Sequence, residues 1–183
     1  MSAASGLRYL YLAYFSQPAG DRLVYRLIRR HRPRRIVELG LGMAERSRRT
    51  IRLAARYHDE PIDYTGIDRF ESRSREDHPG LSLKAAHTAL VATEAKVRLV
   101  PGDPLSALSR VANGLANTDL LLISSLAGRT CPAAWFFVPR MLHEHSLVLI
   151  EETLPGATEP AWRRLPHDEL AALAGSRSER RAA

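Results

Sequence analysis

The feature that most constrains the fold is an apolar run that ends in a glycine-rich turn, followed by a second apolar run that ends in an acid. Residues 35–39 form the first run, Gly40 and Gly42 lie in the turn, and Asp68 closes the second run. Two glycines this close together permit a tight turn and let a bound molecule approach the backbone. The order of strand, turn, helix, strand and acid is typical of α/β proteins that bind a nucleoside-containing ligand.

The same alternation of short apolar runs and helical patterns continues to about residue 152. Strands are expected over 35–39, 62–68, 96–100, 119–124 and 146–150. Helices are expected over 21–31, 44–57, 81–94, 105–113 and 131–143, with a short one over 168–174. Asp21 is expected to cap the first helix. The pattern predicts an α/β fold, a Rossmann-like doubly wound and mainly parallel sheet. We expect about five strands in the order 3-2-1-4-5, with helices on both faces.

Length and composition indicate one domain, because 183 residues with 45% hydrophobic content are enough for a single core. We expect this domain over 1–175, with a helical lead-in over 1–33, a nucleotide-binding core over 34–152 and a flexible tail over 176–183. No strand pair is expected after Glu152. The fifth strand would then be a sheet edge, which favours either a homodimer or a packed C-terminal segment.

The charge and the cysteine content limit the partners and the compartment. The formal net charge of +7 would attract RNA or other anions, but the arginines are scattered over polar helix faces, so nucleic-acid binding is not favoured. Cys131 is the single cysteine, which excludes an internal disulfide and fits a cytoplasmic protein. The apolar stretch 9–15 is too short to span a membrane, so no membrane association is expected.

The residues of the turn argue against two common nucleotide ligands. The dinucleotide fingerprint places a third glycine three residues after the second, and here that position is Glu45. Its carboxylate would repel a pyrophosphate, so NAD and FAD are not expected. No Gly-Lys-Ser/Thr sequence follows the turn, so the P-loop pattern is absent as well.

The segment 37–44, Val-Glu-Leu-Gly-Leu-Gly-Met-Ala, resembles motif I of the class I methyltransferases that use S-adenosylmethionine (SAM). The family pattern is acidic-x-Gly-x-Gly-x-Gly, and Ala44 replaces its last glycine. Asp68 resembles the acid that ends the family's second strand, and Gly102-Asp103 resembles its Gly-Asp after the third strand. The resemblance covers about residues 20–152 and implies that SAM is the cofactor.

The resemblance also implies roles for individual residues around the turn. Gly40 and Gly42 would lie against the cofactor, and the Asp68 carboxylate would accept hydrogen bonds from both ribose hydroxyls. Glu38 would help to hold the methionine ammonium, directly or through water. The alternative for Glu38 is a pairing with a nearby arginine.

Two further residues are expected on the adenine side, each with a simpler alternative. Asp103 would lie beside the adenine amino group, although Gly-Asp-Pro is also a common turn. Phe70 would stack on the adenine ring, although an aromatic residue at this position also suits loop packing.

The acceptor side carries no comparable motif. The segment 123–128, Ile-Ser-Ser-Leu-Ala-Gly, lacks the Asn/Asp-Pro-Pro-Tyr/Phe of enzymes that methylate amino groups in nucleic acids. It also lacks the magnesium-binding aspartates of metal-dependent O-methyltransferases. Ser124 and Ser125 are suited to line a pocket, whereas His143 and His145 are interpreted as polar surface. No metal site is therefore expected, and no catalytic residue is assigned.

These observations favour a SAM-dependent methyltransferase that acts on an unidentified small-molecule acceptor. One alternative is a non-catalytic methyltransferase-like protein that binds a cofactor or a partner, which the expected lack of later strands motivates. A second alternative is an RNA methyltransferase, which the positive charge motivates.

Overall fold

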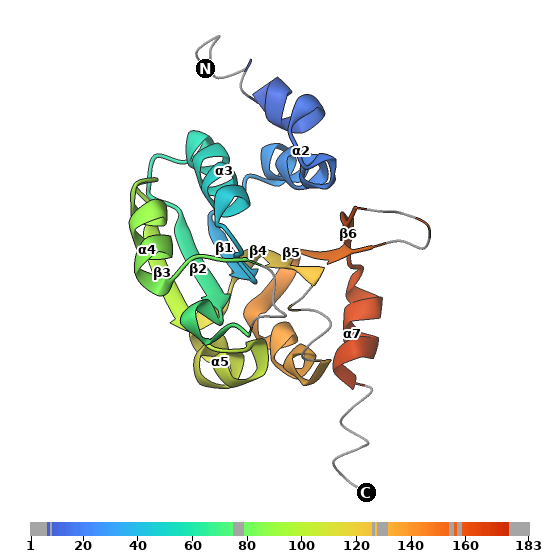
Figure 1. The fold of residues 1–183 in the computed structure, drawn as a ribbon. Coiled ribbons are helices and arrows are strands. Elements are labelled where there is room, and N and C mark those ends of the chain that lie inside the picture. The colour runs from blue at the N-terminus through green and yellow to red at the C-terminus, as the bar shows by residue number, and fades with distance from the viewer. Residues whose placement is uncertain are drawn as a thin grey trace, which may run out of the picture.

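A six-stranded sheet in the order β3-β2-β1-β4-β5-β6 forms the centre of the molecule (Figure 1). The computed structural model describes residues 7, 9–74, 79–125, 127, 132–153, 156 and 159–175. The strands are β1 Arg35–Leu39, β2 Asp63–Asp68, β3 Lys96–Pro101, β4 Thr118–Ile123, β5 Leu142–Glu152 and β6 Ala161–Arg164. The first five strands pair in parallel, and β6 pairs with β5 in the antiparallel direction.

Helices cover both faces of this sheet. The α-helices are α2 Arg22–His31, α3 Glu45–Ala54, α4 Leu83–Val91, α5 Pro104–Val111 and α7 His167–Gly175. The shorter elements are the π-helix η1 Tyr11–Phe15 and the 3-10 helices η2 Ala19–Asp21, η3 Ala55–Tyr57, η4 Phe70–Ser72, η5 Ala112–Leu115 and η6 Pro132–Met141. Within the described residues, no helix is both long and apolar enough to cross a membrane.

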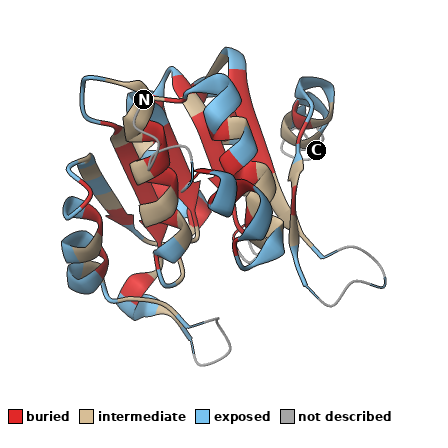
Figure 2. Cartoon of the chain, turned by 90° about the horizontal axis from the view of Figure 1, so that it is seen from above, coloured by how far each residue is buried: buried red, intermediate tan, exposed pale blue. Residues whose placement is uncertain are grey.

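Alternation along the strands divides the core into two apolar clusters. On β4, Leu120 and Leu122 pack with α2, α3 and α4, whereas Leu121 and Ile123 pack with α5, η6 and α7. Successive side chains of a strand point to opposite faces, so a strand that is covered on both sides needs a continuous apolar run. Figure 2 shows this burial along the central strands.

The structure confirms the predicted doubly wound α/β sheet, with the strand order 3-2-1-4-5 for its first five strands. The helix that was expected over 131–143 is instead the 3-10 helix η6, which contains Pro139. Pro139 lacks the amide proton that an α-helix interior requires, and its ring clashes with the preceding turn, so a continuous α-helix is disfavoured here. The expected tail over 176–183 lies outside the described residues.

The prediction that no strand follows Glu152 is wrong. Strand β6 pairs with the end of β5, with Glu151 opposite Trp162 and Glu152 opposite Ala161. An edge strand buries few side chains, and in β6 only Trp162 is fully buried. Its sequence therefore shows no apolar alternation. Because β6 covers the edge of β5, the reason given for a homodimer no longer applies.

Candidate cofactor-binding site

A pocket of about 280 Å³ lies at the carboxyl ends of the central strands. Its walls come from the glycine turn after β1, from residues that follow β2 and β4, and from the end of β5. The short helix η2 closes one side through Asp21. In open parallel sheets, ligands bind at this edge, where neighbouring connections run to opposite faces.

The two glycines of the turn serve different purposes. A Cβ atom on Gly40 would lie 2.0 Å from Ser124 Oγ, so a bare backbone is needed where β1 approaches the end of β4. A Cβ atom on Gly42 would find Pro79 O as its nearest neighbour, at 3.9 Å. Both residues have positive φ, +84° and +57°, which favours glycine. Gly42 thus leaves open space beside the pocket that it lines.

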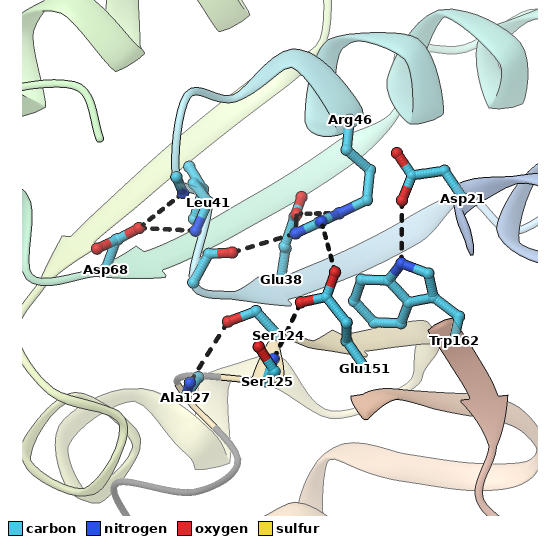
Figure 3. A network of polar contacts seen from close by, with 12 residues as sticks. Asp21, Glu38, Leu41, Arg46, Asp68, Ser124, Ser125, Ala127, Glu151 and Trp162 are labelled. Carbon is cyan, nitrogen blue, oxygen red and sulfur yellow. Dashed lines mark hydrogen bonds and ion pairs between the residues drawn. The ribbon is translucent and has the colours of Figure 1, made fainter. Parts of the chain in front are cut away.

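Asp68 holds the glycine turn from the end of β2. Its Oδ2 atom accepts hydrogen bonds from the amides of Leu41 at 2.7 Å and Gly42 at 3.2 Å, as Figure 3 shows. The same oxygen pairs with Arg73 at 2.6 Å. Within the described residues, Oδ1 receives only a long contact of 3.5 Å from the Phe70 amide. This oxygen is the one that remains available to a ligand in the pocket.

Glu38 does not reach the pocket, because both of its carboxylate oxygens are engaged behind the wall. The residue is fully buried. Its Oε1 atom accepts hydrogen bonds from Nε and Nη2 of Arg46, at 3.0 and 2.8 Å. Its Oε2 atom accepts one from the Tyr64 hydroxyl at 2.7 Å. The structure therefore places Glu38 in the arginine pairing that the sequence had left open.

Arg46 takes the place at the pocket wall that Glu38 was expected to occupy. Its guanidinium lies 4.7 Å from the centre of the Trp162 ring and 3.7 Å from Glu151 (Figure 3). Burial alone would lower the pKa of Arg46, but the carboxylates of Glu38, Asp21 and Glu151 raise it above its ordinary value. Arg46 therefore stays charged and ties β1, β5 and β6 together.

Asp21 does not cap helix α2, so this prediction is wrong. No side-chain cap bond forms at that position. Its Oδ1 atom instead accepts a hydrogen bond of 3.0 Å from Trp162 Nε1. The carboxylate is buried but lines the pocket. Burial raises its pKa, and Arg46 opposes that rise. No local pattern predicts this placement, because the partner, Trp162, lies on the unpredicted strand β6.

Phe70 and Asp103 lie outside the pocket wall. Phe70 has a φ of +47°, and its buried side chain packs into the apolar core. Asp103 caps helix α5 by accepting hydrogen bonds from the Leu105 and Ser106 amides, at 3.0 and 3.1 Å. Bonds from Ser106 lower the pKa of Asp103. The neighbouring Gly102 does line the pocket.

The far side of the pocket is formed where β4 and β5 end. Ser124 and Ser125 line it, as the sequence suggested. The Ser125 amide donates a hydrogen bond of 3.0 Å to Glu151, which fixes the ends of the two strands against each other. Over the described part of the chain, no group of at least 3 His, Cys, Asp or Glu side chains is arranged to hold a metal ion.

Comparisons with known proteins bear on the fold alone. No family model matches the chain, and no curated sequence is significantly similar to it. The chain resembles the O-methyltransferase TomG from Streptomyces achromogenes with a TM-score of 0.57 at 16% identity, covering 100% of this chain and 80% of TomG. The calicheamicin enzyme CalS11, a TDP-rhamnose 3′-O-methyltransferase, gives a TM-score of 0.57 at 18% identity. The match covers 88% of this chain and 93% of CalS11.

An O-methyltransferase from Bacillus cereus, solved with S-adenosylhomocysteine (SAH), gives a TM-score of 0.53 at 14% identity, covering 82% of this chain and 67% of that one. The chain therefore has the fold of class I SAM-dependent methyltransferases, as its motif I predicted.

Proposed function

We propose that the pocket binds SAM and that the protein transfers its methyl group to a small-molecule acceptor. The observation that carries this proposal is the position of Asp68. Its carboxylate ends β2, holds the glycine turn and keeps one oxygen available beside the pocket. The same place in the family pattern belongs to the acid that binds ribose.

The residues at this end of the pocket fit the adenosine part of SAM. Asp68 Oδ1 is suited to accept a hydrogen bond from a ribose hydroxyl. The open backbone at Gly42 permits close approach of the ligand, and Gly102 lines the wall further along. SAM supplies a methyl carbon on a positively charged sulfur.

The opposite end is suited to an acceptor, because it is formed by Ser124, Ser125 and Glu151, where β4 and β5 end. Methyl transfer depends mainly on the orientation of the two reacting atoms, which a rigid pocket supplies. TomG and CalS11 are described as O-methyltransferases, which supports an acceptor hydroxyl. The non-catalytic alternative rested partly on missing strands, and β6 supplies one of them.

The proposal is tested with SAM that carries a labelled methyl group. The purified protein is incubated with a panel of phenols, nucleotide sugars and total RNA, and the label is followed by mass spectrometry. We expect label in a small molecule, and much less with Asp68→Asn. The matched control is Glu60→Gln, which changes an exposed carboxylate paired with Arg34. Label in RNA alone, or in no fraction, would contradict the proposal.

A further inference from the structure

Among the described residues, one carboxylate in the pocket wall forms no direct ion pair, although Arg46 lies close enough to affect it. Asp21 is 3% exposed, and Trp162 engages only its Oδ1 atom. The described residues give its Oδ2 atom no hydrogen bond, and the side chain lines the pocket. Oδ2 is therefore able to accept a hydrogen bond from a group in the pocket.

The other acids near the pocket have direct partners. Asp68 pairs with Arg73, and Glu45 pairs with Arg49. Glu151 accepts a hydrogen bond from the Ser125 amide and lies near Arg46.

The charges around Asp21 favour a cation. Its neighbours are Arg46 from α3, Glu151 from β5 and Glu38 from β1, with the Tyr25 hydroxyl from α2 close by. Three carboxylates thus surround one guanidinium. A buried carboxylate without full compensation is unfavourable, and its burial raises the pKa of Asp21. A cationic group in the pocket would relieve this imbalance.

The position of Asp21 indicates which part of the ligand it would contact. Asp21 and Asp68 lie on opposite sides of the glycine turn, with Arg46 between them (Figure 3). A ligand whose ribose lies at Asp68 would pass along the turn toward Asp21. We propose that Asp21 binds the ammonium group of the methionine part of SAM. This inference rests on the proposed function and gives Asp21 the role that the sequence had assigned to Glu38.

Trp162 is the positioning residue for this interaction. Its indole N–H holds Oδ1, which leaves Oδ2 for the ligand. Asparagine at position 21 retains an oxygen for the indole but removes the negative charge, so Asp21→Asn isolates the effect of the charge.

The test is calorimetric titration of Asp21→Asn with SAM and with SAH, since both compounds carry the ammonium. Loss of a hydrogen bond to a charged group weakens binding substantially, so we expect the affinities for SAM and for SAH each to fall about 10- to 100-fold. Glu60→Gln, with the same change of charge on an exposed side chain, is expected to bind like the wild type. We also expect Asp21→Asn to melt at a higher temperature at neutral pH, because the substitution removes a buried charge.

Three results would overturn the inference. If Asp21→Asn binds both compounds like the wild type, Asp21 does not contact the ligand, while the proposed function stands. If only SAM loses affinity, Asp21 responds to the sulfonium and not to the ammonium. If the wild type binds neither compound, this inference and the proposed function fail together. Should Asp21→Asn not fold, Asp21→Ser is titrated instead, with the same expected losses.

Discussion

Arg46 donates two hydrogen bonds to a single oxygen of Glu38, at 3.0 and 2.8 Å, and Glu38 is fully buried. The pair joins helix α3 to strand β1 directly beside the glycine turn. In this chain the carboxylate at the motif I position is therefore engaged by Arg46, and Arg46 itself lines the pocket.

Removing Arg46 should strongly destabilise the fold. The Arg46→Ala variant leaves the Glu38 carboxylate buried without its cation, and breaking such a pair lowers the free energy of unfolding by about 3–5 kcal/mol. Urea denaturation of the variant and the wild type measures the difference.

A double-mutant cycle separates the pair from its surroundings. The double variant Arg46→Ala, Glu38→Gln should lose less free energy of unfolding than the sum of the two single variants, because no unpaired carboxylate is then buried at position 38. Strict additivity would show that the two side chains do not depend on each other.

The two glycines of the turn should respond differently to alanine. Gly40→Ala places a Cβ atom 2.0 Å from Ser124 Oγ, so overpacking and the left-handed backbone together should cost about 2–4 kcal/mol. In Gly42→Ala the added Cβ atom has open space around it, so the variant should lose only about 1–2 kcal/mol in free energy of unfolding, from its left-handed backbone. Thermal unfolding followed by circular dichroism compares the two. Equal losses would contradict the distinction drawn between them.

The same pair offers a test on binding. Since Gly42 lines the pocket, a Cβ atom there should weaken the binding of SAM in a protein that remains folded. Unchanged affinity for SAM in Gly42→Ala would mean that the ligand does not approach this part of the turn.

The features that local sequence patterns determine were predicted correctly. The continuous apolar run of β4 and the turn with Gly40 and Gly42 were predicted because two-sided burial and tight turns each require particular residue types. Strand β6 was missed because an edge strand with one buried side chain, Trp162, leaves no pattern. Asp21 was misassigned for a related reason. Its partner lies 141 residues away, and a helix start offers a simpler local explanation.

Trp162 should matter through both its ring and its N–H group. Trp162→Ala removes a buried ring beneath Arg46 and should lower the free energy of unfolding by about 3–5 kcal/mol. Trp162→Phe keeps an aromatic ring and loses the hydrogen bond to Asp21, which should cost about 1 kcal/mol. Guanidinium denaturation measures both variants. A larger loss for phenylalanine than for alanine would contradict this account.

The stability should depend on pH through Asp21. Its pKa in the folded protein is raised above the ordinary value of 3.8, so the folded state binds this proton more tightly than the unfolded state does. The contribution of Asp21 to the free energy of unfolding is therefore fully present below about pH 4. It is lost as the pH rises through the raised pKa of Asp21. Relative to Asp21→Asn, the wild type should thus lose stability from acidic to neutral pH.

Melting temperatures of the two proteins, measured in parallel across this range, give the difference directly. Arg46, Glu38, Glu151 and Tyr25 also face Asp21, but both proteins share them, so their effects largely cancel. A difference that does not change with pH would contradict the assignment.

Calorimetric titration of the wild type with SAM and with SAH is the decisive test of whether the pocket at the glycine turn binds SAM. We expect saturable binding of both compounds. We also expect Asp68→Asn, which keeps an oxygen for the Leu41 and Gly42 amides but removes the charge, to bind SAM and SAH more weakly while remaining folded. Absence of binding to the folded wild-type protein, or equal affinity in Asp68→Asn, would contradict the proposed SAM site.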